Sequence, residues 1–557
     1  MHEWKLWVQR LPDRDLWYHF VREGCFTPLI SQILINKGFD NINSAYQFLH
    51  PQLSDLGNPF EIPEMDLAVK RIEDALKNNE KIGIYGDSDA DGIIGSYILY
   101  DFLHKISQKE PFVLLPDKNR EGYGFHSKFL PIFKEAGVKL IITVDVGISA
   151  YETVNEAKAL GIDVIVTDHH EVRERPQTWV ITNKFTPKDS SLHHICGAGV
   201  VLALIRALRT YLYQRGFFTT GKPPSLREYL ELVAIATLAD MVPLLGDNRV
   251  ITYFGFRDLA NPAHPALRTL FSSLNLKYPL TEEDLYYKII SSINACGRLG
   301  KPEVCFNLLK STTPQEIEAN IAEMLSLNQK RQNLEIELWD KIQNNLIIEE
   351  SSSVVLGIFE GIPKGMLGLL ANRLKNQYEK PVFLLSIENG IAYGSARSPE
   401  GINLLEKLWS FKDNFIELGG HQRAFGFSLY KEKITEFKNI IKQLGIEYEK
   451  REKFLFIDGQ TNLTELLLEE NQLAIKEMPP FGLSHTPPLL VIKNFEIKDF
   501  EILKEKHTKL SLREGSQEIT AICFNQVLPS KVKLLAAVPY FNNYSMKLEL
   551  KVEDFKA

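Results

Sequence analysis

The sequence predicts an α/β protein of several domains, with a parallel sheet in its first large domain. Four apolar runs alternate there with helical stretches. The runs lie near residues 82–86, 112–115, 139–144 and 163–167, and the helices near 92–105, 126–136 and 149–160. This alternation is typical of parallel strands joined by crossover helices. Ligands of such sheets bind beyond the carboxyl ends of the strands, so side chains that follow the strands are expected to share one pocket.

Acidic side chains follow three of these predicted strands. Asp87, Asp89 and Asp91 lie in one short run after the first strand, Asp145 follows the third, and Asp168 opens an Asp-His-His run after the fourth. Three like charges this close repel each other, and a divalent cation is the usual compensation. The pattern therefore predicts metal-dependent phosphate chemistry at one edge of the sheet.

Two simpler interpretations of the acidic run are weaker. Asp-x-Asp-x-Asp-Gly also opens a calcium-binding EF-hand loop, but that loop needs a glutamate at its twelfth position and a preceding helix. Here the twelfth position is Ile98, and the preceding residues 81–86 predict a strand. A solvated acidic turn would explain one cluster of acids. It would not explain the same strand-then-acid arrangement three times.

Composition limits the classes of protein to consider. A chain of 557 residues with 44% hydrophobic residues can form about three or four packed domains and is not disordered. The net charge of −7 excludes a generally basic nucleic-acid coat. The N-terminus lacks the layout of a signal peptide, and no apolar run approaches the ~18 residues of a membrane span, so a cytoplasmic location without membrane contact is expected. The five cysteines form no CxxC pair and are expected to be buried, reduced thiols.

Five segments follow from the pattern along the chain. We expect a helical region at 1–60, the first α/β domain at 61–312, a linking helix at 313–348, a second α/β domain at 349–445 and a small β-barrel at 446–557. Thr313, Pro314 and Glu316 predict a capped start for the linking helix. From Lys450 onward the chain carries equal numbers of acidic and basic residues, so the part before it carries the whole negative charge.

The side chains that follow the strands match the needs of a two-metal hydrolase. Such a site needs bridging carboxylates, one or two imidazoles and a water molecule between ions about 3.5–4 Å apart. Sites dominated by carboxylates prefer Mg²⁺ or Mn²⁺, and an imidazole favours Mn²⁺. Asp240 ends a predicted apolar helix, and by itself it would be only a helix-end charge. The ligands needed for such a site are supplied by Asp89, Asp91, Asp145, His169 and Asp240.

Motifs along most of the chain resemble those of the DHH phosphoesterase superfamily and, within it, the RecJ family. The Asp-rich run and Asp168-His169-His170 carry the first resemblance. The second rests on several further motifs in the family's order. These are residues 116–124, 144–149, 197–200, 239–243, 294–299, 327–332 and 395–398, Gly419-Gly420-His421, 480–482 and 507–510.

The resemblance implies a DHH domain with a parallel sheet, a long linking helix, a DHH-associated second α/β domain and a C-terminal OB-like β-barrel. It also implies roles for individual side chains. The implied metal ligands are Asp87, Asp89, Asp91, Asp145 (bridging), His169 and Asp240; the implied catalytic residues are His170 and Asp168; and the implied substrate-binding residues are Arg120, Tyr123, Asn294, Arg298, Ser395, Arg397, Gly420 and His421.

The function implied is hydrolysis of single-stranded DNA from the 5′ end to mononucleotides, with two Mn²⁺ or Mg²⁺ ions, in DNA recombination and repair. Single-stranded DNA is the implied partner, with single-strand-binding protein and a helicase as candidate protein partners. The alternatives are a DHH phosphoesterase of short oligoribonucleotides or cyclic dinucleotides, and a non-catalytic nucleic-acid-binding subunit. Such a subunit would be expected to lose metal acids, and this chain keeps them.

The chain departs from the family pattern in three places. Tyr85 stands where other branches of the superfamily carry a metal-binding histidine, and Ser88 replaces a usual aromatic residue. Ile362-Pro363 replace a Trp-His pair just before Gly365. None of these changes removes a primary acid, but the last one affects the expected substrate contacts of the second domain.

Overall fold

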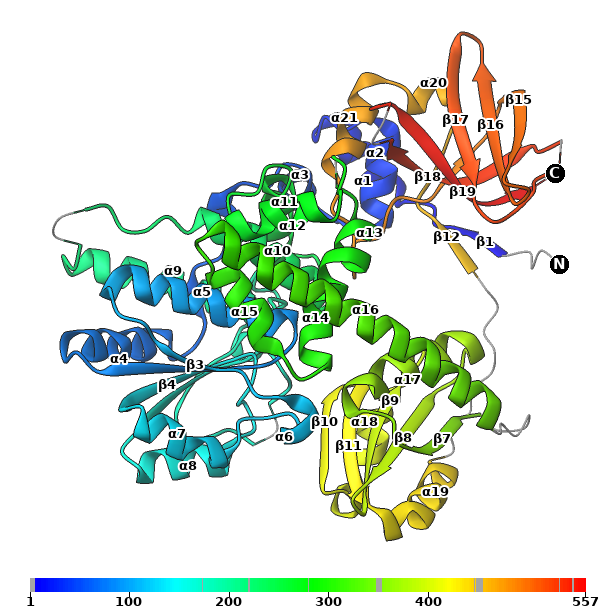
Figure 1. Cartoon of the computed structure of the whole chain (residues 1–557). Coiled ribbons are helices and arrows are strands. Elements are labelled where there is room, and N and C mark those ends of the chain that lie inside the picture. The colour runs from blue at the N-terminus through cyan, green and yellow to red at the C-terminus, as the bar shows by residue number, and fades with distance from the viewer. Residues whose placement is uncertain are drawn as a thin grey trace.

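The computed structural model describes residues 6–172, 174–218, 221–278, 280–346, 353–444, 446, 454–529, 531–542 and 545–556. Figure 1 shows three bodies: an α/β domain covered by helices, a second α/β domain, and a β-rich domain on which the N-terminal helices pack. The long helix α16 (Pro314–Asn345) runs from the first body to the second.

The first domain is built on a five-stranded sheet in the order β3-β2-β4-β5-β6, and all neighbouring pairs are parallel. Its strands are β2 (Lys81–Gly86), β3 (Phe112–Leu114), β4 (Val138–Val144), β5 (Asp163–Thr167) and β6 (Trp179–Ile181). The predicted strands and the parallel sheet are confirmed. The edge strand β6 was not predicted, because it is only three residues long.

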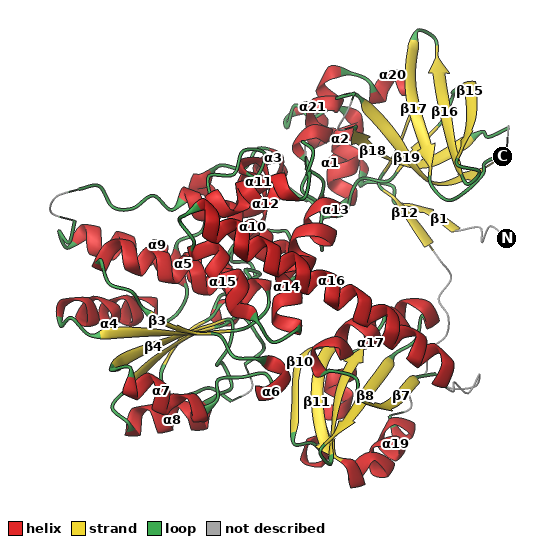
Figure 2. Cartoon of the chain, in the orientation of Figure 1, coloured by secondary structure: helices red, strands yellow, loops and turns green. Residues whose placement is uncertain are grey.

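Helices cover both faces of this sheet because successive strand side chains point to opposite faces. Ile84, Ile142 and Ile165 join the larger core with α4 (Met65–Lys77), α5 (Ala90–Ser107), α9 (Gly197–Gln214) and α10 (Leu230–Ala239). Ile141 and Val164 join the core on the other face, with α7 (Leu130–Glu135) and α8 (Tyr151–Ala159). Figure 2 shows the sheet edge-on between these two helical layers.

A helical region extends the larger core toward α16. Its helices are α11 (Asp247–Asp258), α12 (Pro265–Ser273), α13 (Glu282–Asp284), a π-helix at Leu285–Ile290, α14 (Ser291–Arg298) and α15 (Pro302–Lys310). Thr313 caps α16 by accepting a hydrogen bond from the Glu316 N–H at 3.4 Å. Ile317 and Ile321 of α16 pack into the first domain, whereas Leu338 and Ile342 pack into the second. The helix therefore belongs to both cores.

The second domain carries a mixed five-stranded sheet in the order β10-β11-β9-β8-β7, parallel only between β7 and β8. The strands are β7 (Val355–Glu360), β8 (Val382–Glu388), β9 (Ile391–Arg397), β10 (Glu417–His421) and β11 (Ala424–Tyr430). Its helices are α17 (Lys364–Tyr378), α18 (Leu404–Trp409) and α19 (Ile434–Gln443). Residues 419–421, which belong to one of the family motifs, lie in strand β10.

The C-terminal domain is a small barrel, as predicted. Its sheet order is β13-β14-β18-β19-β17-β16-β15. The strands are β13 (Gly459–Thr461), β14 (Leu490–Ile492), β15 (Glu496–Leu503), β16 (His507–Glu514), β17 (Gln517–Cys523), β18 (Leu534–Phe541) and β19 (Leu548–Lys556), with helices α20 (Leu463–Leu466) and α21 (Glu469–Glu477). The edge strands of this order are β13 and β15, and only residues 493–495 separate β14 from β15 along the chain.

The N-terminal region is not independent of this barrel. Helices α1 (Arg14–Arg22), α2 (Pro28–Asn36) and α3 (Ile42–Leu49) share one core with the barrel strands. The prediction that residues 1–60 are helical is wrong at β1 (Leu6–Gln9), which pairs in parallel with β12 (Phe454–Ile457). β12 was expected within the barrel, but it pairs outside it. Trp4 lies outside the described residues.

Two further observations bear on the compartment and on the thiols. Within the described ranges, no helix is both long and apolar enough to cross a membrane. All five cysteines are free, and four of them are buried as expected. Cys25 is the exception: it is exposed in the turn between α1 and α2, where its backbone φ is 55°.

Candidate metal centre

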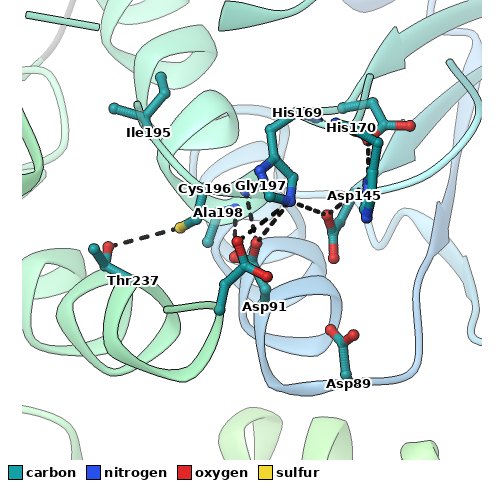
Figure 3. A network of polar contacts seen from close by, with 12 residues as sticks. Asp89, Asp91, Asp145, His169, His170, Ile195, Cys196, Gly197, Ala198 and Thr237 are labelled. Carbon is teal, nitrogen blue, oxygen red and sulfur yellow. Dashed lines mark hydrogen bonds and ion pairs between the residues drawn. The ribbon is translucent and has the colours of Figure 1, made fainter. Parts of the chain in front are cut away.

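Six acids and two histidines meet at the carboxyl ends of the parallel strands. Asp87 follows β2, Asp145 follows β4, and Asp168, His169 and His170 follow β5. Asp89 caps α5, Asp91 lies in its first turn, and Asp240 is the C-cap residue of α10. Figure 3 shows the His169 imidazole between the carboxylates of Asp91 and Asp145. The shared pocket expected from the sequence is therefore formed.

The ligand atoms divide into overlapping groups. Within each group they lie within 4.8 Å of one another: Asp87, Asp89 and Asp145; Asp91, His169 and Asp240; and Asp145, His169 and His170. His169 Nε2 lies 3.2 Å from Asp145 Oδ1 and 3.5 Å from Asp240 Oδ2. Asp145 belongs to two of these groups, so its carboxylate lies where they overlap.

The backbone at Asp145 is specialised for this position. Its φ of 60° lies in the left-handed region, which few residues other than glycine adopt. Its N–H continues the ladder of the sheet by donating to Thr167 O at 2.9 Å. A Cβ on Gly197 would lie 2.7 Å from the Asp145 carboxylate, so glycine is needed there for α9 to approach.

The N-terminus of α9 orients Asp91. The N–H groups of Gly197 and Ala198 donate to the two oxygens of this carboxylate at 2.6 Å and 2.8 Å. A helix N-terminus is a favourable partner for an anion. Asp91 therefore links α5 to α9, and the bonds from both N–H groups fix its plane toward His169.

The electrostatics of the acids fit divalent cations. Burial, with further contributions from neighbouring acids, raises the pKa of Asp91 to about 7 and the pKa values of Asp145 and Asp240 well above the usual range. The buried Oδ1 of Asp145 accepts no hydrogen bond from any described residue. Carboxylates that repel one another in a dry site are stabilised by a cation, and this oxygen-rich donor set with one imidazole suits Mn²⁺ or Mg²⁺.

Asp168 orients His170 and does not belong to the groups of described side chains that could hold a metal ion. Its carboxylate accepts the N–H groups of Ile148, His169 and His170 at 3.0, 2.8 and 3.1 Å, and it contacts His170 Nδ1 at 2.7 Å. Burial opposes the charged form of His170, but Asp168, together with Asp240 and Asp87, outweighs it and raises the pKa of the imidazole to about 9. The Tyr123 hydroxyl adds a contact to His170 Nδ1 at 3.1 Å. These contacts fix the His170 ring beside the metal ligands.

Lys118 is a site residue that the sequence interpretation missed. Its ammonium group bonds Asp87 and lies 3.4 Å from Asp89 Oδ2, so it contacts the acidic run directly. Arg120, which was expected to recognise the substrate, has an 83% exposed side chain beside Asp117. Both lie in the quoted motif at 116–124, on the short helix α6 (Lys118–Glu121). Only the three-dimensional direction of α6 decides which cation faces the site.

Cations of the second domain lie close to cations of the first domain. Burial and the charge of Arg298 lower the pKa of Arg397 to about 10, and burial and Arg331 lower the pKa of Arg298. Burial, then Arg397 and Arg423, lower the pKa of Lys375. Arg397 donates to Ser395 Oγ at 2.9 Å, which brings together two predicted binding residues. Lys375 and Arg423 were not predicted, because neither belongs to a quoted motif.

The remaining predicted positions have other surroundings. Asn294 Oδ1 accepts the Ala90 N–H at 2.9 Å, so this side chain supports the start of α5. Gly420 lies in β10 with φ 133°, and the side chain of His421 lies outside the described part of the structure. The Tyr85 hydroxyl donates to Gly124 O at 2.9 Å within a buried aromatic core. Ile362 is also buried in a core, so these two of the three departures leave no polar group in the site.

Three family models match consecutive parts of the chain. The DHH family N-terminal domain matches residues 81–237, the DHHA1 domain matches residues 351–445, and the RecJ OB domain matches residues 457–552. Together with the parallel sheet and its acid–imidazole edge, these matches define a hydrolase of the DHH class with an associated nucleic-acid-binding barrel.

Whole-chain comparisons are more specific. The chain is 32% identical over 537 residues to the single-stranded-DNA-specific exonuclease RecJ of Bacillus subtilis (strain 168), which covers 93% of this chain but 66% of that protein. It is 30% identical to the Haemophilus influenzae protein of the same name, covering 89% of each. The crystal structure of RecJ in complex with Mn²⁺ from Thermus thermophilus superposes with a TM-score of 0.81 at 25% identity, covering 99% of this chain and 79% of that one. This chain belongs to the RecJ family.

Proposed function

We propose that this protein is a metal-dependent exonuclease that degrades single-stranded DNA from its 5′ end to mononucleotides, in DNA recombination and repair. The observation that carries the proposal is that two charged clusters lie at one contact between domains. The first domain carries crowded carboxylates and imidazoles, the second carries crowded cations, and helix α6 contacts both the acids and the second domain. A phosphodiester chain can lie between them, with one phosphate at the acids and another at the cations.

The acids and His169 would hold two ions, Mn²⁺ or Mg²⁺. Asp87, Asp89 and Asp145 fit one of them, and Asp91, His169 and Asp240 fit the other. Such ions supply an activated water and neutralise charge on the phosphate that is attacked. Lys118 pairs with Asp87 and Asp89. This lysine therefore places a positive charge beside the acids that would hold one of the ions.

His170 is proposed to stabilise the phosphate under attack. Its raised pKa keeps the imidazole protonated at neutral pH, so a positive charge lies beside the acids. Asp168 and Tyr123 hold the ring in one orientation. A preoriented positive charge stabilises the negative charge that develops on phosphate oxygens without reorganising during the reaction.

The second domain and the barrel are proposed to select and hold the strand. Ser395, Arg397 and Arg298 would bind phosphates in the passage between the α/β domains, together with Lys375 and Arg423. A passage lined in this way admits one strand more readily than a duplex. The OB barrel would hold the strand beyond it by phosphate contacts and base stacking. We propose the domain limits 61–312, 313–348, 349–445 and 446–557, with helices α1, α2 and α3 packed on the last segment.

One assay tests the activity, the polarity and the strand preference together. Purified protein with Mn²⁺ is given a long single strand labelled at its 5′ or at its 3′ end, and a blunt duplex. The 5′ label should leave early as a mononucleotide, the 3′ label should stay on progressively shorter products, and the duplex should be nearly inert. Early release of the 3′ label, or equal rates on duplex, contradicts the proposal. Cleavage of short oligoribonucleotides or cyclic dinucleotides alone would support the alternative activity.

We propose a cellular setting from the family resemblance and from the free thiols. Family resemblance suggests single-strand-binding protein and a helicase as partners, and five unpaired thiols fit a reducing, cytoplasmic compartment. Affinity purification of the tagged protein from its own cells tests the first idea. Cell fractionation tests the second.

A further inference from the structure

The short helix α6 contacts both halves of the site. Lys118, its first residue, bonds the acidic run through Asp87. The next residue, Asn119, contacts the second domain instead. Its Oδ1 accepts the N–H of Gly365 at 2.7 Å, and its Nδ2 donates to Arg298 O at 2.9 Å. Two neighbouring side chains therefore reach the two halves that a substrate strand would bridge.

Asn119 caps a helix of the other domain. Helix α17 begins at Lys364, and its own N-cap residue, Pro363, provides no side-chain cap. The first N–H groups of a helix need partners from outside it, and asparagine is among the preferred capping residues. Asn119 supplies this partner from a position 246 residues earlier in the chain. The cap contributes to α17 only while the two domains stay in this arrangement.

The contact is close on both sides. Arg298 Nη1 donates to Gly365 O at 3.1 Å, so Gly365 is held through both of its backbone polar groups. A Cβ on Gly365 would lie 2.5 Å from Arg298 O and 2.8 Å from Asn119 Oδ1. A carbonyl oxygen cannot yield as a flexible side chain can. The absence of a side chain at residue 365 is therefore what allows the domains to meet here.

Helix α17 carries this contact to the cation cluster. A Cβ on Gly368, one turn after Gly365, would lie 2.6 Å from Arg397 Nη2, so α17 packs directly on that guanidinium group. Lys375, further along α17, also belongs to the cluster. A shift of α17 would therefore move the proposed phosphate-binding cations relative to the acids.

We propose that Asn119 is a positioning residue that sets the spacing between the metal-binding acids and the cations of the second domain, and so determines product length. The inference rests on the proposed function, because it takes a strand to span both clusters. With the spacing fixed, the phosphate at the acids is always the same number of nucleotides from the phosphate at the cations. Without the cap this spacing varies.

Three variants separate positioning from stability. Asn119→Ala removes both hydrogen bonds. Asn119→Asp keeps an acceptor for the Gly365 N–H and loses the donor to Arg298 O. Gly365→Ala leaves Asn119 in place but forces the surfaces apart, while alanine is the better residue within a helix. The matched control is Asn403→Ala, which removes a comparable cap, to the Glu406 N–H at 3.1 Å, wholly within the second domain.

The readouts are KM, kcat and the length of the first products released from a 5′-phosphorylated single strand with Mn²⁺. Asn119→Ala and Gly365→Ala should each raise KM about fivefold, the factor expected for loss of one helix cap, with a smaller change in kcat. Both should release di- and trinucleotides beside mononucleotides. Asn119→Asp should stay nearer to the unaltered protein, and Asn403→Ala should match it in KM and product length.

The inference is overturned if Asn119→Ala and Gly365→Ala release the same products as Asn403→Ala with the same KM. It is also overturned if all three variants lose activity only in proportion to a lower folded fraction, measured by thermal unfolding. Failure of the proposed function has a different result: the unaltered protein would then show no 5′ to 3′ degradation of single strands at all.

Discussion

The two halves of the site are both built from crowded like charges, but the charges have opposite sign and respond in opposite ways. In the first domain, burial and mutual repulsion raise the pKa values of Asp91, Asp145 and Asp240. In the second, burial and neighbouring cations lower the pKa values of Arg397 and Lys375. In each half, burial and like charges disfavour the charged form of the side chains, and a ligand of the opposite charge stabilises that form.

The difference indicates a division of work. Clustered carboxylates with an imidazole bind small hard cations, whereas guanidinium and ammonium groups bind phosphate oxygens. Loss of an acid should therefore affect the chemical step, and loss of a cation should affect substrate binding. The predictions below test this division, beginning with the change that should be largest.

Removing the bridging acid should abolish hydrolysis. We expect Asp145→Ala to lower the rate of nucleotide release at least about a thousandfold, because the metal site loses the carboxylate that lies where its ligand groups overlap, while binding of a single strand persists. Release of a 5′ label with Mn²⁺ measures the first effect, and fluorescence anisotropy measures the second. The control is Asp163→Ala at the opposite end of the same sheet, where the acid only pairs with Arg71. Substantial Mn²⁺-dependent activity in folded Asp145→Ala protein would refute the two-metal interpretation.

Removing a cation of the second domain should have a smaller effect, confined to binding. Arg397→Ala should raise KM about 10- to 100-fold, the range for a lost charge-assisted hydrogen bond of about 1.5–3 kcal/mol, with kcat nearly unchanged. Steady-state kinetics on a 5′-phosphorylated strand measure both constants. Arg373→Ala is the matched control, because that arginine lies on α17 but stacks on Trp339. A fall in kcat with constant KM would place Arg397 in the chemical step and break the division.

Replacing Lys118 tests whether a cation beside the acids competes with the metal ions. Its ammonium group contacts Asp87 and Asp89, two of the proposed metal ligands, so Lys118→Ala should let Mn²⁺ bind more tightly, by about fivefold for loss of a partly buried competing charge. Isothermal titration of the metal-free protein measures this affinity. Weaker Mn²⁺ binding in the variant would mean that Lys118 organises the acids and does not compete with the ions.

The smallest effect concerns stability and should leave neutral-pH hydrolysis unchanged. Burial, then Arg249, lowers the pKa of His485 to about 3, against about 6.5 in an unfolded chain. Below pH 6.5 the His485 imidazole binds a proton in the unfolded chain but not in the folded protein. This difference lowers the free energy of unfolding as the pH falls. Between pH 6.5 and 5.5 the loss is about 1 kcal/mol. Denaturant unfolding should show a shallower pH slope in His485→Gln, and an identical slope would contradict this assignment.

The shared core of the N-terminal helices and the barrel changes how the barrel can be tested. Removing the chain from about residue 450 onward would strip α1, α2 and α3 of the core that they share with the barrel strands. Arg249 of α11 also donates to Phe48 O and Met478 O, which ties the first domain to both parts. Substitutions on the exposed strand β15 therefore test the grip on DNA better than truncation does.

Much of the first domain could be predicted from local patterns. Strand runs, crossover helices and the acids after them are encoded within a few residues of one another, so periodicity and one topological rule placed Asp87, Asp145 and Asp168 at one edge. The needs of a two-metal site added Asp240 and His169, which the structure brings to the same edge. The barrel followed from the spacing of its strands, although local patterns placed β12 within it.

Only the tertiary structure decided the contacts between distant segments. The pairing of β1 with β12 joins residues more than 400 positions apart, and no local period records it. The same holds for the choice of Lys118 over Arg120, for the cations Lys375 and Arg423, and for the cap that Asn119 gives to α17. A sequence pattern states which face a residue takes within its own element. Which other element meets that face depends on how the cores pack, and in this protein that packing brings the two charged halves together.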